Sequence, residues 1–190
     1  VSCVGLHWLK GVSAMSWEVM EVGDFTGDGK VDILWRQETT GKNAVWEMDG
    51  VGYVALHWLN SVSGTEWGIE GVGDFTGDGK PDILWRHRVT GEMAVWEMDG
   101  VNYVGLHWLR RVSDLTWQIV GVGDFSGDGS PDILWRQNTS GANAVWEMDG
   151  LTYLALHWLR AVDDPSWEVE GVGDFTKDGK VDILWRQETT

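Results

Sequence analysis

The sequence predicts an all-β fold of repeated four-stranded units, and three observations support this prediction. First, one 50-residue pattern runs along the chain without insertions: Asp32-Ile33-Leu34-Trp35-Arg36 returns at 82, 132 and 182. Second, apolar residues inside each repeat alternate with a period of two, which is typical of strands. Third, glycine-containing turns separate these segments, and none has the pattern of an amphipathic helix. Four strands in a repeat of about 40–50 residues are typical of a β-propeller blade.

Each repeat contains four predicted strands in a fixed order. In the first complete repeat they are residues 17–25, 31–37, 43–48 and 53–59. Large apolar residues occupy both faces of these strands, and a sheet that is apolar on both faces packs between two neighbours. The first strand gains glycine in later repeats, for example Gly71, which suits a crowded inner strand. We therefore expect most tryptophans to pack between blades.

The repeats predict one propeller, or propeller segment, over residues 1–190, with repeat starts near 17, 67, 117 and 167. Residues 1–9 match the fourth strand of a repeat, so we expect an outer strand of an incomplete blade. The last repeat contains two strands, which leaves partial blades at both ends. Unpaired strand edges favour association. A self-closed ring of four blades, a ring completed by two chains and a longer parent chain all remain open, and we favour an oligomer or a longer repeat chain.

Composition excludes several classes of function. The net charge is −16, and an acidic surface disfavours binding to nucleic acid or to an anionic membrane. No apolar run approaches the roughly 18 residues of a membrane span, so we expect no membrane insertion. Cys3 is the only cysteine, which excludes an internal disulfide framework. The first residues contain no initiator methionine and no signal-peptide pattern, so we expect a processed product or an excised fragment.

A nine-residue acidic loop follows the first strand of every repeat. In the first copy, residues 24–32, carboxylates occupy positions 1, 5 and 9, a hydroxyl occupies position 3 and glycine occupies position 6. Hard oxygen donors at alternate positions of a tight loop are typical of a Ca²⁺ site, and position 7 adds its backbone carbonyl. The loop has no histidine or cysteine for zinc, and position 12 is Trp35 instead of the EF-hand glutamate. The predicted calcium ligands are Asp24, Thr26, Asp28, Lys30, Asp32, Asp74, Thr76, Asp78, Lys80, Asp82, Asp124, Ser126, Asp128, Ser130, Asp132, Asp174, Thr176, Asp178, Lys180 and Asp182.

The loop and the strands that flank it resemble a known repeat. Residues 22–36, followed by Thr40-Gly41 and by residues 44–50, resemble the bacterial form of the FG-GAP/VCBS repeat of integrin-α-like propellers. The resemblance covers essentially the whole chain. It implies a β-propeller with Ca²⁺ in the first hairpin of each blade, a secreted or cell-surface setting, and a role in adhesion, glycan binding or display.

This chain departs from the family pattern at two positions of the loop. Position 3 is threonine or serine, as in Thr26, where the family often has asparagine or aspartate. In the last loop Lys177 replaces the glycine at position 4, which makes that loop the least regular of the four.

Repetition favours binding over catalysis. No set of residues has a catalytic pattern, and His7, His57, His107 and His157 stand at equivalent positions, so we expect structural histidines and no enzyme activity. Several equivalent weak sites give avidity. A sugar site combines an aromatic platform with arginine and acidic groups, and each repeat supplies these types. The predicted carbohydrate residues are Arg36, Glu47, Trp58, Arg86, Glu97, Trp108, Arg136, Glu147 and Trp158.

Two hypotheses for function follow from these residues. The first is a calcium-binding, multivalent lectin-like or adhesion module with a glycan or cell-surface ligand. The second is a non-catalytic structural or protein-interaction scaffold of a larger secreted protein, which the variable segments between repeats, such as 60–66 and 110–116, would serve better. The structural interpretation of Arg36 is a pair with a nearby acid, and that of the tryptophans is burial in the core.

Overall fold

The computed structural model describes residues 7–12, 16–164 and 166–187. These residues form strands and no helix, so the described part of the chain has no helix that could cross a membrane. The strands are β1 (Trp17–Gly23), β2 (Asp32–Gln37), β3 (Lys42–Asp49), β4 (Gly52–Trp58), β5 (Trp67–Gly73), β6 (Asp82–His87), β7 (Met93–Asp99), β8 (Asn102–Leu109), β9 (Trp117–Gly123), β10 (Asp132–Gln137), β11 (Asn143–Asp149), β12 (Thr152–Leu159), β13 (Trp167–Gly173) and β14 (Asp182–Gln187).

The strands form antiparallel sheets in simple chain order. Three sheets have four strands each, β1 to β4, β5 to β8 and β9 to β12, and β13 pairs with β14 alone. This confirms the predicted all-β fold of four-stranded, blade-like repeats. Of the expected outer strand at residues 1–9, residues 7–9 are not in a strand and residues 1–6 lie outside the described residues. This outer strand stays a prediction. Closure of the sheets into a ring stays a prediction.

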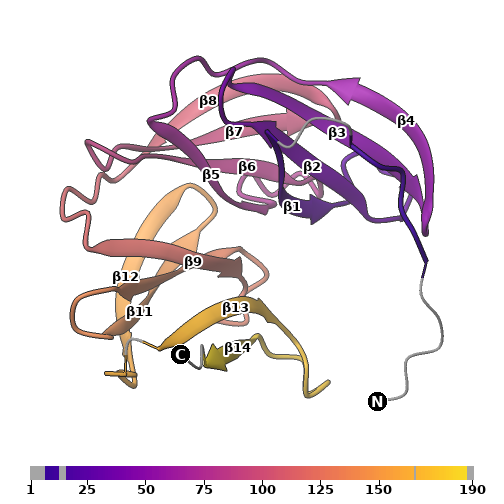
Figure 1. Cartoon of the computed structure of the whole chain (residues 1–190). Helices are drawn as coiled ribbons and strands as arrows, with labels where there is room; N and C mark the ends of the chain where they lie inside the picture. Colours follow the sequence, from indigo (N-terminus) through magenta and orange to yellow (C-terminus); the bar gives the residue numbers. More distant parts are fainter. Residues whose placement is uncertain (1–6, 13–15, 165, 188–190) are drawn as a thin grey trace.

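The sheets follow one another along an arc, with the first strand of each sheet on the inner side (Figure 1). β1 contacts β5, β5 contacts β9 and β9 contacts β13. The contact is close: a Cβ atom at Gly71 of β5 would lie 2.4 Å from Cγ2 of Val122 in β9. Crowding therefore favours glycine at this position of β5 and β9, whereas β1 has Glu21 there.

The hydrophobic core lies between neighbouring sheets. Leu34 and Val45 of the first sheet pack against Ile83 and Trp85 of the second, and all four are buried. The second and third sheets repeat this arrangement. Each shared interface therefore stacks the aliphatic face of one sheet on the tryptophan-bearing face of the next.

The strand register assigns side chains to these two faces. Across β2, β3 and β4, Trp35 pairs with Ala44 and Ala44 with Trp58, so these side chains share one face. Leu34, Val45 and His57 form the next row and share the opposite face. The faces follow directly from the period of two along a strand.

Candidate functional site

The acidic loop is a compact turn held by its own aspartates. Asp24 Oδ1 accepts hydrogen bonds from the amides of Gly27 (2.8 Å) and Asp28 (3.0 Å), and its Oδ2 accepts from Gly29 (2.8 Å). Asp28 Oδ1 accepts from the amide of Lys30 at 2.9 Å. Gly27 and Gly29 have φ values of 75° and 81°, a region that favours glycine. The sequence pattern therefore specifies the turn itself, in addition to any ligand.

The last aspartate of the loop ties it to the sheet. Asp32 is fully buried; its Oδ2 accepts from the amide of Thr26 (3.0 Å) and its Oδ1 from the amide of Met48 in β3 (2.9 Å). Asp82 and Asp132 make the equivalent bonds. In the fourth loop, Lys177 takes a positive φ of 62° where the other loops have glycine.

The donor set of the loop fits Ca²⁺ in its chemistry. Three carboxylates, one hydroxyl and the Lys30 carbonyl are hard oxygen donors. An ammonium group already lies against two carboxylates, because Lys30 Nζ is 3.3 Å from Asp28 Oδ2 and 3.1 Å from Asp49 Oδ1. Within the described part of the chain, no three acidic, histidine or cysteine side chains converge as a metal site does. Loop amides and the lysine hold the carboxylates, and calcium binding stays a prediction.

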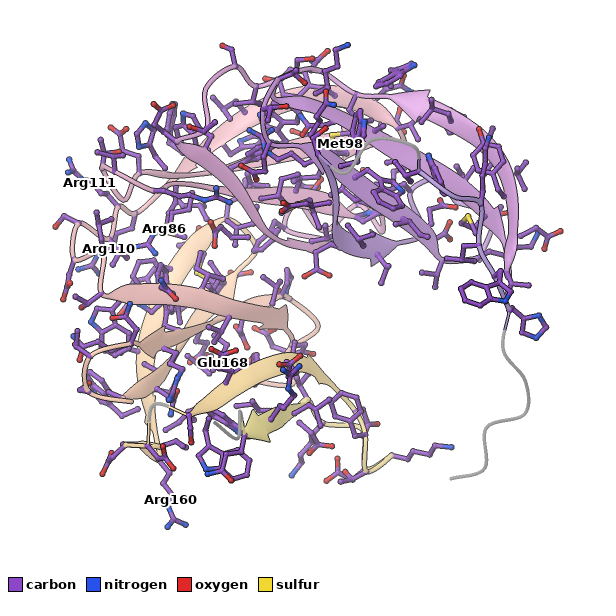
Figure 2. All side chains as sticks on the ribbon, viewed as in Figure 1. Arg86, Met98, Arg110, Arg111, Arg160 and Glu168 are labelled. Carbon is purple, nitrogen blue, oxygen red and sulfur yellow. The ribbon has the colours of Figure 1, made fainter. Side chains whose placement is uncertain are left out.

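The arginines predicted to bind carbohydrate lie between sheets. Arg36 is fully buried, and its Nη2 donates to the carbonyls of Trp67 (3.0 Å) and Val62 (3.4 Å) in the chain that leads into the next sheet. Arg86 is also buried and donates to the carbonyls of Trp117 and Val112. Figure 2 shows Arg86 where the second and third sheets meet. Burial removes these guanidinium groups from any sugar at the surface.

The predicted glutamates and tryptophans lie on opposite faces. Glu47 Oε2 is 2.8 Å from Nε2 of His57, on the aliphatic face. That pair lines a polar hollow of about 500 Å³, which also includes Asp24 and Asn102. Trp58 lies on the other face of the sheet. Arg36 and Glu47 lie on the same face as Leu34 and Val45, so the sheet does not bring Trp58 together with the other two predicted carbohydrate residues of its repeat. Carbohydrate binding at these positions and their equivalents stays a prediction.

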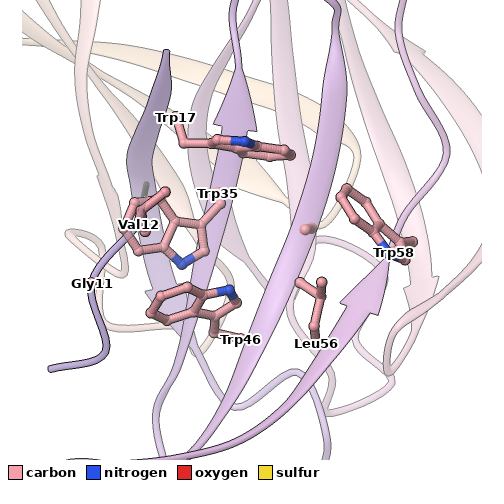
Figure 3. A pocket seen from close by; sticks show the side chains of 8 residues that line it. Gly11, Val12, Trp17, Trp35, Trp46, Leu56 and Trp58 are labelled. Atoms are coloured by element: carbon pink, nitrogen blue, oxygen red, sulfur yellow. The ribbon is translucent and has the colours of Figure 1, made fainter. Parts of the chain in front are cut away.

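A tryptophan-walled pocket occurs in each four-stranded sheet. In the first sheet it has a volume of about 200 Å³ and lies between Trp17, Trp35, Trp46, Leu56 and Trp58. In Figure 3, Trp35 and Trp46 lie side by side on one flank and Trp58 stands on the other. The second and third sheets have pockets of about 220 and 170 Å³. Of the four tryptophans in each repeat, only the last, Trp58 and its equivalents, was among the predicted carbohydrate residues. The signal for the other three was their strict recurrence.

The lining of the three pockets is identical at seven positions. It consists of Val12, Trp17, Trp35, Ala44, Trp46, Leu56 and Trp58 in the first sheet, Val62, Trp67, Trp85, Ala94, Trp96, Leu106 and Trp108 in the second, and Val112, Trp117, Trp135, Ala144, Trp146, Leu156 and Trp158 in the third.

The family of the chain follows from the match of its repeats. The sequence model of the FG-GAP-like repeat matches residues 24–85, 74–135 and 124–185. The chain belongs to the FG-GAP-like repeat family. Repeats of this family are typically non-catalytic structural or adhesion modules. No curated protein matches the FG-GAP-like chain.

Two of the similar solved structures are a toxin pore and a biofilm matrix protein. The Tc holotoxin pore of Photorhabdus luminescens is 12% identical, with a TM-score of 0.62 over 91% of this chain and 8% of that chain. The biofilm matrix protein Bap1 of V. cholerae is 18% identical, with a TM-score of 0.36 over 94% of this chain and 30% of that chain. The FG-GAP-like chain therefore spans a small part of both proteins, and the likeness to the first concerns the fold alone.

Proposed function

We propose that this FG-GAP-like chain is a non-catalytic, calcium-binding module that attaches to glycans at several equivalent sites, outside the cell or on its surface. The observation that supports this proposal is that the tryptophan-walled pocket occurs three times, with the same residue types at the same place on successive sheets. Equivalent sites on successive sheets bind a repetitive ligand with avidity, even where each site is weak. Catalysis needs no such repetition.

Calcium binding is the first part of the proposal. In each loop the cation would be held by the carboxylates at positions 1, 5 and 9, the hydroxyl at position 3 and the carbonyl at position 7, as in Asp24, Asp28, Asp32, Thr26 and Lys30. Bound calcium supplies positive charge that offsets the repulsion between the loop carboxylates. The loops connect the first two strands of every sheet, so a bound cation would stiffen the inner side of the arc of sheets.

Thermal unfolding with calcium or with a chelator tests this part. A ligand that binds the folded state alone adds about 2.7 kcal/mol per site at a hundredfold excess over its dissociation constant. We expect Tm to rise in millimolar Ca²⁺ and to fall in chelator. Asp128→Asn should remove one equivalent of bound calcium in calorimetry, and Asp149→Asn, at the end of β11 and outside the loop, should not. An unchanged Tm contradicts the proposal.

Glycan attachment is the second part. Retention of the chain on immobilised glycans should exceed by far its affinity for the same free monosaccharide, because several sites act together. If no glycan retains the calcium-loaded chain, the scaffold hypothesis becomes the better one. The exposed linkers between sheets, which differ among repeats, are the surface that favours this second function. Asn60 and Ser61 of one linker, for example, correspond to Arg110 and Arg111 of the next.

A further inference from the structure

The tryptophan pocket is built from two tilted indole pairs in every four-stranded sheet. In the second sheet, Trp85 and Trp96 have ring centroids 4.9 Å apart, and Trp67 and Trp108 have centroids 6.0 Å apart. The corresponding distances in the first sheet are 4.9 and 5.8 Å, and in the third 5.1 and 5.8 Å. The same arrangement in three places indicates a specified shape instead of a chance hollow.

One indole of each pocket faces solvent. Trp58, Trp108 and Trp158 are 58%, 63% and 65% exposed, although tryptophan is usually mostly buried. In the second and third sheets the preceding sheet covers the inner tryptophans, and Trp85 and Trp135 are only 2% exposed. These two pockets therefore have a buried aromatic floor and an open aromatic rim. The exposed indole and the apolar hollow beside it form one patch, and such exposed apolar patches mark interaction sites.

The lining restricts the chemistry of a ligand. Its seven common positions are valine, alanine, leucine and tryptophan, with no charged side chain. The indole N–H groups are the only polar side-chain groups among them, and an indole donates but does not accept. Nε1 of Trp35, Trp85 and Trp135 is buried, so it is not offered to a ligand at the surface. The walls therefore suit a neutral ligand with apolar C–H faces.

The size of the pocket restricts the ligand further. A volume of about 170 to 220 Å³ accommodates one six-membered ring and leaves no room for a folded peptide. A neutral pyranose has this size, presents C–H groups on its faces and carries hydroxyl oxygens at its rim. No lining residue of the second and third pockets is charged, and the guanidinium groups of Arg36 and Arg86 are buried against Trp85 and Trp135.

We propose that the four-tryptophan pocket of each complete sheet binds one neutral pyranose unit of a glycan, with its C–H face stacked on the exposed indole. This inference rests on the proposed glycan-binding function and places it in a site that differs from the polar hollow at Glu47 and His57. The buried arginines are not among the lining residues, and the Glu–His pairs lie on the opposite face of the sheet. The chain thus presents three equivalent pyranose sites.

The second and third pockets are the better ones to test. In the first sheet Lys42 Nζ lies 5.9 Å from the Trp58 ring, a contact that has no equivalent at Glu92 or Ala142. The test variant is Trp108→Ala with Trp158→Ala, both exposed, so the fold should survive their removal. The matched control is His107→Ala with His157→Ala, one residue earlier on the same strands and on the opposite face.

The experiment measures retention of the calcium-loaded chain on beads that carry glucose, galactose, mannose, fucose or N-acetylglucosamine, with sialic acid and phenyl beads for comparison. We expect wild-type protein and the histidine variant to be retained by at least one neutral pyranose. Retention of the tryptophan variant should fall about tenfold or more, because two of three sites and their avidity are lost. Unchanged Tm values for both variants show that the fold is intact.

Three other outcomes would overturn the proposal. If the histidine variant loses retention and the tryptophan variant keeps it, the polar hollow binds the glycan; the pocket assignment fails and the proposed function stands. If no neutral pyranose retains the wild-type chain, both fail. If phenyl beads alone retain the wild-type chain and not the tryptophan variant, the pocket takes an aromatic group of another molecule.

Discussion

The guanidinium of Arg36 lies over the indole of Trp85, with Cζ 5.0 Å from the ring centroid, although the two residues belong to different sheets. Arg86 lies over Trp135 at 5.1 Å and Arg136 over Trp185 at 4.9 Å. Each arginine also donates to backbone carbonyls of the chain entering the next sheet. One side chain per repeat therefore fixes both the packing and the spacing of neighbouring sheets.

Removal of such an arginine should destabilise the chain. We expect Arg86→Ala to lower the free energy of unfolding by about 2–4 kcal/mol, because three carbonyls lose a charged donor and a cation–π contact is lost. Arg86→Lys should restore little, since an ammonium cannot reproduce the planar fork. Arg160→Ala, at an exposed linker position, is the control. Urea unfolding measures the difference, and equal stabilities of the Arg86→Ala and Arg160→Ala variants would contradict the structural role.

The sequence predicts the strands and the loops because both depend on local pattern. The turn at Asp24 is specified by its own carboxylate and by Gly29, which lie within one short segment. Burial depends instead on the neighbouring sheet. Trp85 and Trp108 both stand in strands with alternating apolar residues, but Trp85 is 2% exposed beneath the previous sheet and Trp108 is 63% exposed. The period of two does not show how far a neighbour extends, so the pocket could not be predicted.

Two glycines with similar backbone angles should respond differently to alanine. Gly77 and Gly91 have φ values of 74° and 73°. A Cβ at Gly77 meets no atom within 4 Å, whereas one at Gly91 would lie 1.9 Å from the carbonyl oxygen of Val112. Gly77→Ala should cost about 1 kcal/mol from backbone strain alone. Gly91→Ala should cost about 3 kcal/mol or more, because the linker must move. If the two variants lose the same free energy of unfolding in urea, the linker at Val112 moves without cost and the prediction is wrong.

Stability should also depend on the protonation of Glu70. This residue lies at a bulge of β5, and burial raises its pKa from 4.5 to about 7, against the lowering effect of Arg88 and Arg86. The folded state therefore holds a proton that the unfolded state releases between pH 4.5 and 7. Stability contributed by this group falls as pH rises through that window and is constant above it.

Glu70→Gln should remove this dependence. At pH 8 the variant should be more stable than the wild type by about 1–3 kcal/mol, and at pH 4 the two should agree closely. Glu18→Gln, at an exposed position of β1, is the control and should give parallel curves. Unfolding in urea across pH 4 to 8 measures both. A wild-type stability that rises relative to Glu70→Gln between pH 5 and 7 would reverse the sign and contradict the burial argument.

The outer faces of the row should make the isolated chain associate. Phe175 and Leu184 of the β13–β14 sheet are 57% and 48% exposed, whereas Phe75 and Leu84 at the equivalent positions are fully buried against the next sheet. At the other end of the chain, Val22 is exposed on the tryptophan-bearing face of the first sheet. Between successive sheets, a face of this kind is covered by the aliphatic face of the preceding sheet. The two faces are complementary, so a second copy can dock head to tail.

Light scattering should give a mass above 21.3 kDa that increases with concentration. Leu184→Glu should lower that mass, and Val51→Glu, in an exposed turn, should not. A constant monomer mass across concentrations would instead favour a row whose ends meet each other within one chain.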